Sequence, residues 1–241
     1  MDLVFDVLKI KYKKFNMKKL VLLIIHLLPF INYAQQNDSL KFNSFSIGGT
    51  YSADYCYRTT STNPSNRWLK DEMDSLEISK IGYTTGLNFD FTLNNRFSIS
   101  SGLLYSDKGY KLKSKVIPNI DKSIDHIYYL DIPLKFNYNI ISKKTKFFIS
   151  AGISSNIFLS SKILFQKENS SFTNVVKGNS DFSKINFATI LNLGIQNDLS
   201  KSWYFKSEMI YRQSIMPSMK APINQYLYSF GLNVGFYYRL K

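Results

Sequence analysis

Acidic and basic residues recur at alternate positions within segments that are otherwise apolar. In the stretch HIYYLDIPLKFNYNI, residues 126–140, Asp131, Pro133 and Lys135 alternate with large apolar residues. Every second residue of a β-strand points to the same face of its sheet, so this spacing predicts that the charges share one side. The residues predicted to share this interior side are Asp54, Arg58, Asp90, Asp131, Lys135, Lys206, Glu208 and Arg212.

Two kinds of chemistry are open to such a set of interior charges. An unpaired ion is costly to bury, so we expect the acids and bases to pair and to fill the interior as a structural network. The alternative is a narrow path for ions or protons along the same side chains. Pro133 has no backbone N–H, so the strand ladder should lose a hydrogen bond or form a bulge there, and we assign Pro133 a shaping role.

His126 is the candidate for acid–base or nucleophilic chemistry. It is the one histidine beyond the first 34 residues, and it lies beside Asp125 and near Ser123. A histidine with a serine could hydrolyse or transfer lipid acyl groups, but the members of a catalytic triad usually come from separate elements of the fold. We therefore expect no enzymatic activity and no catalytic residues.

Metal and cofactor chemistry has little support in the sequence. One cysteine, Cys56, and one remaining histidine cannot supply the usual zinc ligand sets, and there is no glycine-rich phosphate loop. Cys56 cannot form a disulfide within the chain, and we expect it to be a small buried hydrophobe. We expect no metal and no cofactor.

Residues 17–34, MKKLVLLIIHLLPFINYA, have the order of a signal peptide. Two lysines, an apolar run over 20–28 and a small residue at the cut, Ala34, follow one another. The run is about half of the ~20 residues that a spanning helix needs, so a retained anchor is the weaker alternative. We predict that Met17 is the true start, that 1–16 is an over-extended reading, that 1–34 is removed, and that 35–241 is the mature domain.

Eight segments of the mature chain alternate apolar and polar residues with the period of two that is typical of β-strands. The aromatic content of 16% supports this interpretation, because aromatic residues favour strands. Tyrosines near the segment ends, such as Tyr83, Tyr105 and Tyr128, suit the girdles at membrane interfaces. The apolar positions span 45–57, 81–93, 97–105, 128–140, 147–159, 187–195, 203–211 and 226–240.

The connections between these segments alternate in length. Short turns are expected at Asn94-Asn95, 142–145 and 198–202, and long loops at 59–80, 107–125, 160–184 and 213–224. This alternation predicts an all-β fold, an eight-stranded antiparallel up-and-down transmembrane β-barrel, with both mature termini in the periplasm. Lipid offers no hydrogen-bond partners, so such a sheet must close on itself. The rival fold is a soluble β-sandwich or lipocalin-like barrel, whose apolar face would point inward.

The stretch YYLDIPLKFNY, residues 128–138, resembles the signature of the PorT-like outer-membrane β-barrel family of Bacteroidetes. Phe136 departs from that pattern, which often has a lysine–tyrosine pair nearby, while the layout of the whole mature chain is similar to the family's. The resemblance implies an outer-membrane barrel; the family's namesake is linked to the type IX protein secretion system, and most members have no assigned role. The matching residues are Tyr129, Leu130, Asp131, Ile132, Pro133, Leu134 and Tyr138.

The chain is strongly basic, with a formal net charge of +14. Its densest basic segment, KGYKLKSK, contributes Lys108, Lys111, Lys113 and Lys115 to the second predicted long loop. We expect this loop to lie near the phosphates of outer-membrane lipid and lipopolysaccharide, or to dock an envelope protein partner. Nucleic acid is not an expected partner at the cell surface.

These patterns favour a non-enzymatic, monomeric outer-membrane β-barrel that acts as a structural or interaction component of the cell envelope. The link to protein secretion comes from the PorT-like resemblance alone. One alternative is a small-solute channel or transporter, which needs a continuous wet path through eight strands. The other is an outer-membrane enzyme that modifies lipid.

Overall fold

The computed structural model describes residues 44–113, 122–142, 145–167, 170–176, 182–219 and 223–240. The predicted signal peptide, the predicted start at Met17 and Lys115 of the basic segment lie outside the described residues. No helix in the described ranges has the length and apolar character of a membrane-spanning helix.

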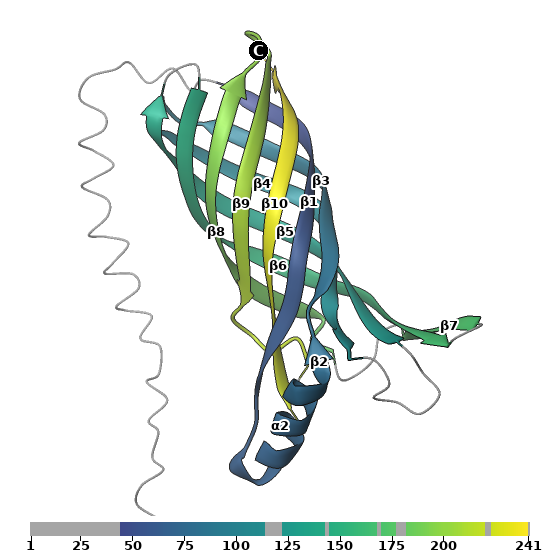
Figure 1. The fold of residues 1–241 in the computed structure, drawn as a ribbon. Coiled ribbons are helices and arrows are strands. Elements are labelled where there is room, and N and C mark those ends of the chain that lie inside the picture. The colour runs from purple at the N-terminus through teal and green to yellow at the C-terminus, as the bar shows by residue number, and fades with distance from the viewer. Residues whose placement is uncertain are drawn as a thin grey trace, which may run out of the picture. The chain divides into compact units, whose positions relative to one another are not determined.

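Within the described residues, eight long strands form a closed antiparallel ring (Figure 1). Each strand pairs with the next in chain order, and the last pairs with the first from Phe45↔Leu240 to Ser61↔Asn224. The prediction of an eight-stranded antiparallel barrel is confirmed. The ring strands are β1 (Phe45–Ser61), β3 (Lys80–Thr92), β4 (Phe97–Leu112), β5 (Lys122–Ser142), β6 (Thr145–Lys167), β8 (Ile185–Asp198), β9 (Trp203–Ser214) and β10 (Asn224–Leu240).

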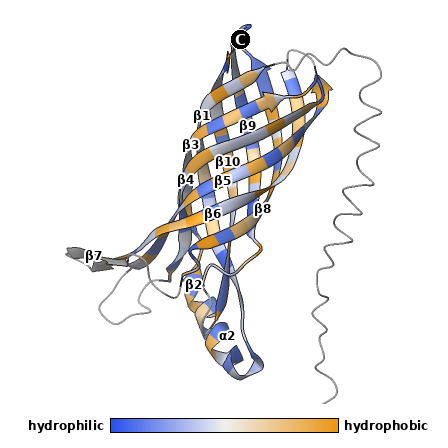
Figure 2. Cartoon of the chain, turned by 180° about the vertical axis from the view of Figure 1, so that it is seen from behind, coloured by the Kyte–Doolittle hydropathy of each residue, from blue (hydrophilic) through white to orange (hydrophobic). Residues whose placement is uncertain are grey.

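The outside of the ring is apolar and the inside is polar. In β10, Leu232 and Phe236 are 59% and 57% exposed, whereas Asn233 and Tyr237, which follow them directly, are buried. Figure 2 shows the same alternation as orange and blue positions along the strands. This is the reverse of a soluble protein, whose apolar side chains lie inside, so the soluble β-sandwich and the lipocalin-like barrel are excluded.

One end of the ring, here called the short-turn end, carries the predicted tight connections. Between β3 and β4, the Asn94 side-chain oxygen accepts hydrogen bonds of 2.8 Å from the backbone N–H groups of Arg96 and Phe97. Between β8 and β9, the Ser200 hydroxyl oxygen accepts from the backbone N–H of Trp203 in the same way, at 3.0 Å. A side chain that replaces a backbone partner is the reason such residues favour turns. The predicted turns at Asn94-Asn95 and 198–202 are confirmed, whereas residues 143–144 of the third predicted turn lie outside the described residues.

The opposite end, here called the long-loop end, differs from the prediction. Strand residues occupy much of the predicted loops 107–125 and 160–184, because β4, β5 and β6 continue past the ring and a further strand, β7 (Ser170–Val176), pairs with β6. The predicted loop 59–80 contains η1 (Pro64–Asn66), α2 (Arg67–Leu76) and β2 (Glu77–Ile78). The outward apolar pattern stops where lipid would end, whereas backbone pairing continues, so the pattern alone placed the strand ends too early.

Aromatic side chains mark two levels on the outside of the ring. Near the long-loop end, the rings of Tyr83, Tyr105 and Tyr128 follow one another with centroid distances of 6.2 and 5.6 Å, and we call them the tyrosine band. Near the short-turn end, the Trp203 ring lies beside the Tyr238 ring, with the centroids 4.9 Å apart. Aromatic rings gather at both water interfaces of a membrane, so the surface between these levels is the membrane-spanning part.

Pro133 shapes the ladder in the predicted way on one of its two sides. Ser101↔Leu134 and Leu104↔Asp131 pair with the same register, but no pairing occurs between them, where Pro133 faces Gly102. The pairing with β6 is continuous through Pro133, and the bulges of β5 and β6 lie elsewhere, at Tyr128/Tyr129 and Asn139/Ile141. The missing N–H therefore removes ladder pairs without moving the register.

Candidate functional site

Ion pairs fill the barrel interior from the short-turn end upward. The first joins Asp90 of β3 to Lys206 of β9 across the lumen. Two more donors hold the same carboxylate, because the Tyr204 hydroxyl donates to Oδ2 at 2.8 Å and the Ser100 hydroxyl donates to Oδ1. A buried carboxylate with this many charged and neutral donors is fully solvated by protein groups.

The next layer is centred on Glu208, which is the next inward-facing residue after Lys206 along β9. Lys135 of β5 approaches its Oε1 at 3.5 Å, and Asn233 of β10 donates to its Oε2 at 2.7 Å. These partners come from strands on different sides of the ring. The contact therefore ties the barrel walls together through its interior.

Two further pairs lie nearer the long-loop end. Arg212 donates to Asp54 at 2.9 Å, and the Ser52 and Thr84 hydroxyls also donate to that carboxylate. Lys108 of β4 lies 2.8 Å from an oxygen of Asp131 on the neighbouring strand. Each buried charge in these layers thus has an opposite charge within reach.

Large side chains close the interior at both ends. At the short-turn end, the rings of Tyr204 and Tyr237 stack with centroids 4.9 Å apart. At the long-loop end, Ile127, Tyr129 and Leu227 form a buried cluster. Phe158 and Phe182 pack against that cluster, and the Phe158 and Phe182 rings stack at 4.7 Å.

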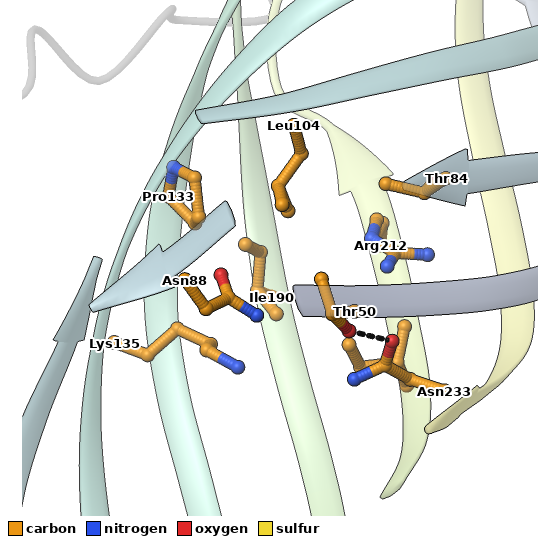
Figure 3. Close-up of a pocket in the computed structure, with 10 residues that line it drawn as sticks. Thr50, Thr84, Asn88, Leu104, Pro133, Lys135, Ile190, Arg212 and Asn233 are labelled. Carbon is orange, nitrogen blue, oxygen red and sulfur yellow. Dashed lines mark hydrogen bonds between the residues drawn. The ribbon is translucent and has the colours of Figure 1, made fainter. Parts of the chain in front are cut away.

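The space left between these layers is small. A cavity of about 20 Å³ lies among Thr50, Lys135, Arg212 and Asn233, and Figure 3 shows these side chains pointing toward it, with Thr50 hydrogen-bonded to Asn233. A second cavity of about 10 Å³ lies beyond Arg212, which lines both. A void needs roughly 10–15 Å³ to hold one water molecule, so neither cavity fits a larger solute.

The structure buries all eight residues that the alternation assigned to the interior. Six of them pair with each other: Asp54 with Arg212, Asp90 with Lys206, and Lys135 with Glu208. Asp131 and Arg58 instead pair with residues that the sequence reasoning missed, Lys108 and Glu77. The PorT-like motif divides between two faces: Tyr129, Asp131 and Pro133 point inward, and Leu130, Ile132, Leu134 and Tyr138 point outward.

Lys108 was wrongly assigned to an outer loop. It lies within β4, is 7% exposed, and follows Leu104 and Ser106 on the inward side of that strand. The even spacing from those two residues was a usable signal, since alternation along a strand continues beyond the last outward apolar residue. Lys111 and Lys113 do reach the long-loop end, partly exposed and exposed respectively.

A second interior cluster lies above the hydrophobic closure, beyond the tyrosine band. Arg58 binds both carboxylate oxygens of Glu77 and stacks over the Tyr110 ring at 4.2 Å. Burial raises the pKa of the Glu77 carboxyl above its ordinary value, although Arg58 opposes this shift. Burial likewise raises the pKa of Asp125, whose carboxylate accepts from the Tyr110 hydroxyl.

His126 has a different partner from the neighbours that the sequence suggested. Its Nδ1 lies 2.8 Å from Oδ2 of Asp107 on β4, and the Lys80 ammonium lies 2.6 Å from the other oxygen of that carboxylate. Lys80 also lies 2.9 Å from the same imidazole nitrogen. A carboxylate from a separate strand can orient an imidazole, and Asp107 is in this position. Asp125 could not supply this arrangement, because it is next to His126 in the sequence. Among the described residues, no group of three or more potential ligands is placed to hold a metal ion.

Comparison with known proteins identifies a family with the same architecture. The sequence profile of a family described as "Outer membrane protein beta-barrel domain" matches residues 33–238. A search of curated proteins gives no match.

Three solved structures are similar at low sequence identity. Neisserial surface protein A is 12% identical, with a TM-score of 0.47, over 81% of this chain and 97% of that one. OprG from Pseudomonas aeruginosa is 12% identical, with a TM-score of 0.43, over 84% and 98%. The attachment invasion locus protein Ail of Yersinia pestis is 12% identical, with a TM-score of 0.40, over 82% and 98%.

Proposed function

This chain belongs to the outer membrane protein beta-barrel domain family, and on that premise we propose that it is a non-enzymatic component of the cell envelope. In this proposal the barrel acts as a single closed anchor in the outer membrane. The elements at its long-loop end are the part that meets a partner.

The filled interior is the observation that carries this proposal. Paired charges occupy successive layers, and aromatic and aliphatic side chains close both ends. A barrel of eight strands has an interior that side chains can fill, so its functional surface is expected at the ends. At the long-loop end, α2 stands clear of the ring, none of its residues is buried, and Trp68 is 66% exposed (Figure 1).

The orientation is part of the proposal. In bacterial outer-membrane barrels, short turns face the periplasm and longer connections face outward. Phe45 and Leu240 pair with each other at the short-turn end, so this rule places the two described ends of the chain in the periplasm. The long-loop end, with α2 and β7, then faces outward.

The finer assignment to a PorT-like group, with a link to protein secretion, rests on the motif around Asp131 and Pro133. In the barrel, Asp131 takes part in the interior ion pairs and Pro133 interrupts one ladder. Both roles are architectural, so the motif supports a common barrel design. Deletion of the gene, followed by assays of secreted protein and of envelope permeability, tests the secretion link; normal secretion would remove it.

The interaction role is tested by site-specific photo-cross-linking in living cells. A photoreactive residue in place of Trp68 should give a discrete cross-linked protein, because this side chain projects from the exposed helix. The same residue in place of Leu232, on the lipid-facing side of β10, is the control and should give none. Absence of a protein adduct at Trp68, together with a deletion strain that has no phenotype, would contradict the proposal.

A small-solute channel is the alternative that the filled interior disfavours. Planar-bilayer recordings of the purified protein should show no stepwise conductance, since the cavities beside Arg212 accommodate no more than water. Reproducible single-channel steps that are lost on blocking the long-loop end would favour the channel.

A lipid-modifying enzyme is the second alternative, and the contact between His126 and Asp107 is the observation in its favour. Against it, the Lys80 ammonium competes for the same imidazole nitrogen, which a catalytic base would need in a defined tautomer. Purified protein and its His126→Ala variant should leave radiolabelled outer-membrane lipid equally unchanged. Release of acyl chains by the wild type alone would replace our proposal with the enzyme.

A further inference from the structure

The outward face of β4, β5 and β6 continues beyond the tyrosine band as a basic surface. Cross-strand pairing places Gly109, His126 and Lys162 in one row across the three strands. The next outward row on the same face contains Lys111 of β4. We call Lys111, His126 and Lys162 the basic face.

Within the part of the chain that the structure describes, Asp107 is the one carboxylate on this face, and it is already neutralised. Asp107 contacts Lys80 at 2.6 Å and His126 at 2.8 Å. Asp125, next to His126, accepts instead from Tyr110 on the other side of the sheet. Among the described residues, no carboxylate forms an ion pair with Lys111, Lys113 or Lys162, so their charges remain available to an external anion.

The height of the basic face on the barrel indicates which anion it meets. The Lys162 ammonium lies 5.5 Å from the centre of the Tyr128 ring, and the His126 ring stacks on Tyr128 with a centroid distance of 6.0 Å. Tyrosine rings of this kind lie at the level of the lipid head groups. Cations directly beyond them are therefore placed at the level of lipid phosphates, where each lysine contributes to binding.

The outward surface next to β8 at the long-loop end is mainly apolar, although Lys184 before β8 is exposed. On β8 and in the connection after β9, the outward residues at the long-loop end are Ile185, Phe187, Ile215 and Met216, all exposed and apolar. A general attraction to an anionic surface would need no such asymmetry. The extension of β6 leans away from the barrel toward β7, with which it pairs, in both views (Figures 1 and 2). The pairing of β4 with β5 keeps one register from Leu104↔Asp131 to Lys111↔Ile124, so the outward face of these strands continues from the lipid-facing wall.

We propose that the basic face binds the phosphate groups of a glycolipid in the outer leaflet of the outer membrane. Lys111 and Lys162 supply the charge, and the partly exposed imidazole of His126, held by Asp107, supplies a hydrogen bond between them. The identification of the lipid as an outer-leaflet glycolipid rests on the proposed orientation. The phosphate chemistry itself does not.

The test measures lipid binding to the protein purified from membranes in an uncharged detergent. Isothermal titration with lipid A that carries two phosphates is compared with the same lipid after enzymatic removal of both phosphates. Removal of the phosphates should weaken binding at least tenfold. The variant Lys111→Gln/Lys162→Gln should lose about fivefold in affinity per lysine for the phosphorylated lipid, and should match the wild type for the dephosphorylated one.

A matched control changes one exposed lysine at the same end of the barrel. Lys184 precedes β8 and lies outside the basic face, so Lys184→Gln should bind the phosphorylated lipid within twofold of the wild type. Circular dichroism and heat-dependent gel mobility of each variant establish that the barrel is intact. The substituted side chains are all outside the interior network, so folding should be unaffected.

Three results would overturn the inference. Equal affinity of the protein for the two lipids would show that the basic face does not recognise the phosphate groups. A loss of affinity in the Lys184→Gln control equal to that in Lys111→Gln/Lys162→Gln would show the same. Inorganic phosphate that binds as tightly as the lipid would make the face a site for a free anion. The orientation is tested separately, by labelling Lys162→Cys on intact cells with an impermeant thiol reagent. The native Cys56 is fully buried, so it should not react with the reagent.

Discussion

Lys108 of β4 and Asp131 of β5 form an ion pair 2.8 Å long in the barrel interior, on the lipid-spanning side of the hydrophobic closure. The Lys108 ammonium also lies 5.1 Å from the centre of the Tyr129 ring. Tyr129 and Asp131 both belong to the PorT-like motif. The pair therefore connects the motif to a residue outside it, and to the side chains that close the long-loop end.

The first prediction concerns this pair. Asp131→Asn leaves the Lys108 charge buried without its counter-ion, and should lower the free energy of unfolding by about 3–5 kcal/mol. The double variant Lys108→Gln/Asp131→Asn removes both charges and should recover most of the loss. Urea unfolding of the barrel in lipid vesicles, followed by tryptophan fluorescence, measures both.

Lys113→Gln is the control for this prediction, since its side chain is exposed beyond the end of β4. Its free energy of unfolding should stay within about 0.5 kcal/mol of the wild type. If Asp131→Asn were as stable as the double variant Lys108→Gln/Asp131→Asn, the contributions of Lys108 and Asp131 to stability would not depend on each other.

The second prediction compares two glycines on opposite faces of the sheet. A Cβ at Gly231 would lie 2.0 Å from Oδ1 of Asp54 and 2.6 Å from the Ser52 hydroxyl, so Gly231→Ala must displace the carboxylate that Arg212 binds. We expect a loss of about 1–3 kcal/mol from this overpacking. Gly49 faces lipid and has nothing within 4 Å, so Gly49→Ala should be neutral or stabilising by up to about 1 kcal/mol.

The same urea titrations decide this comparison. If Gly49→Ala proved as destabilising as Gly231→Ala, crowding beside Asp54 would not be the cause.

The architecture could be predicted because lipid inverts the usual pattern of polarity. Each spanning strand must show an apolar residue at every second position, and the residues between them are then interior by default, as for Asp90 and Glu208. Burial of the predicted interior set follows from this alternation alone. It required no knowledge of which strands face each other.

The pairing inside the barrel could not be predicted in the same way. Which charges meet across the lumen depends on the stagger between strands, and no local pattern encodes that stagger. Lys206 meets Asp90 from six strands later in the chain order, and Arg58 meets Glu77 from an element, β2, that has only two residues. Beyond the tyrosine band the outward side need not be apolar. The alternation of apolar residues therefore no longer marks the strand that contains Lys108, and it gives no signal for α2.

The third prediction tests the apolar belt directly. Leu232 lies halfway along β10 on its lipid-facing side, and Leu232→Arg should lower the free energy of unfolding in vesicles by about 2–4 kcal/mol. Ile78 of β2 lies beyond the tyrosine band and is also exposed, so Ile78→Arg should cost less than about 1 kcal/mol. Equal costs at the two positions would remove the assignment of the bilayer to the surface between the aromatic levels.

The fourth prediction concerns the pH dependence of stability at Asp125, which lies beyond the tyrosine band. Burial raises the pKa of this carboxyl above its ordinary value of 3.8, while the Tyr110 hydroxyl, Arg58, Lys80 and His126 oppose the shift. The folded protein therefore binds this proton more tightly than the unfolded chain. Its contribution to stability is present at low pH, falls as the pH rises from the unfolded pKa through the folded one, and is constant above.

Asp125→Asn removes this titration while it keeps the size of the side chain. Relative to the wild type, the variant should be most favoured near pH 7, and its advantage should shrink as the pH falls toward the ordinary carboxyl range. Asp71→Asn, at an exposed position of α2, should show no such trend. Because Asp125 also raises the pKa of Glu77, the comparison is repeated in a Glu77→Gln background. A stability difference that grows on acidification in both backgrounds would show that Asp125 is held as the charged form, with its pKa depressed by Arg58 and Lys80.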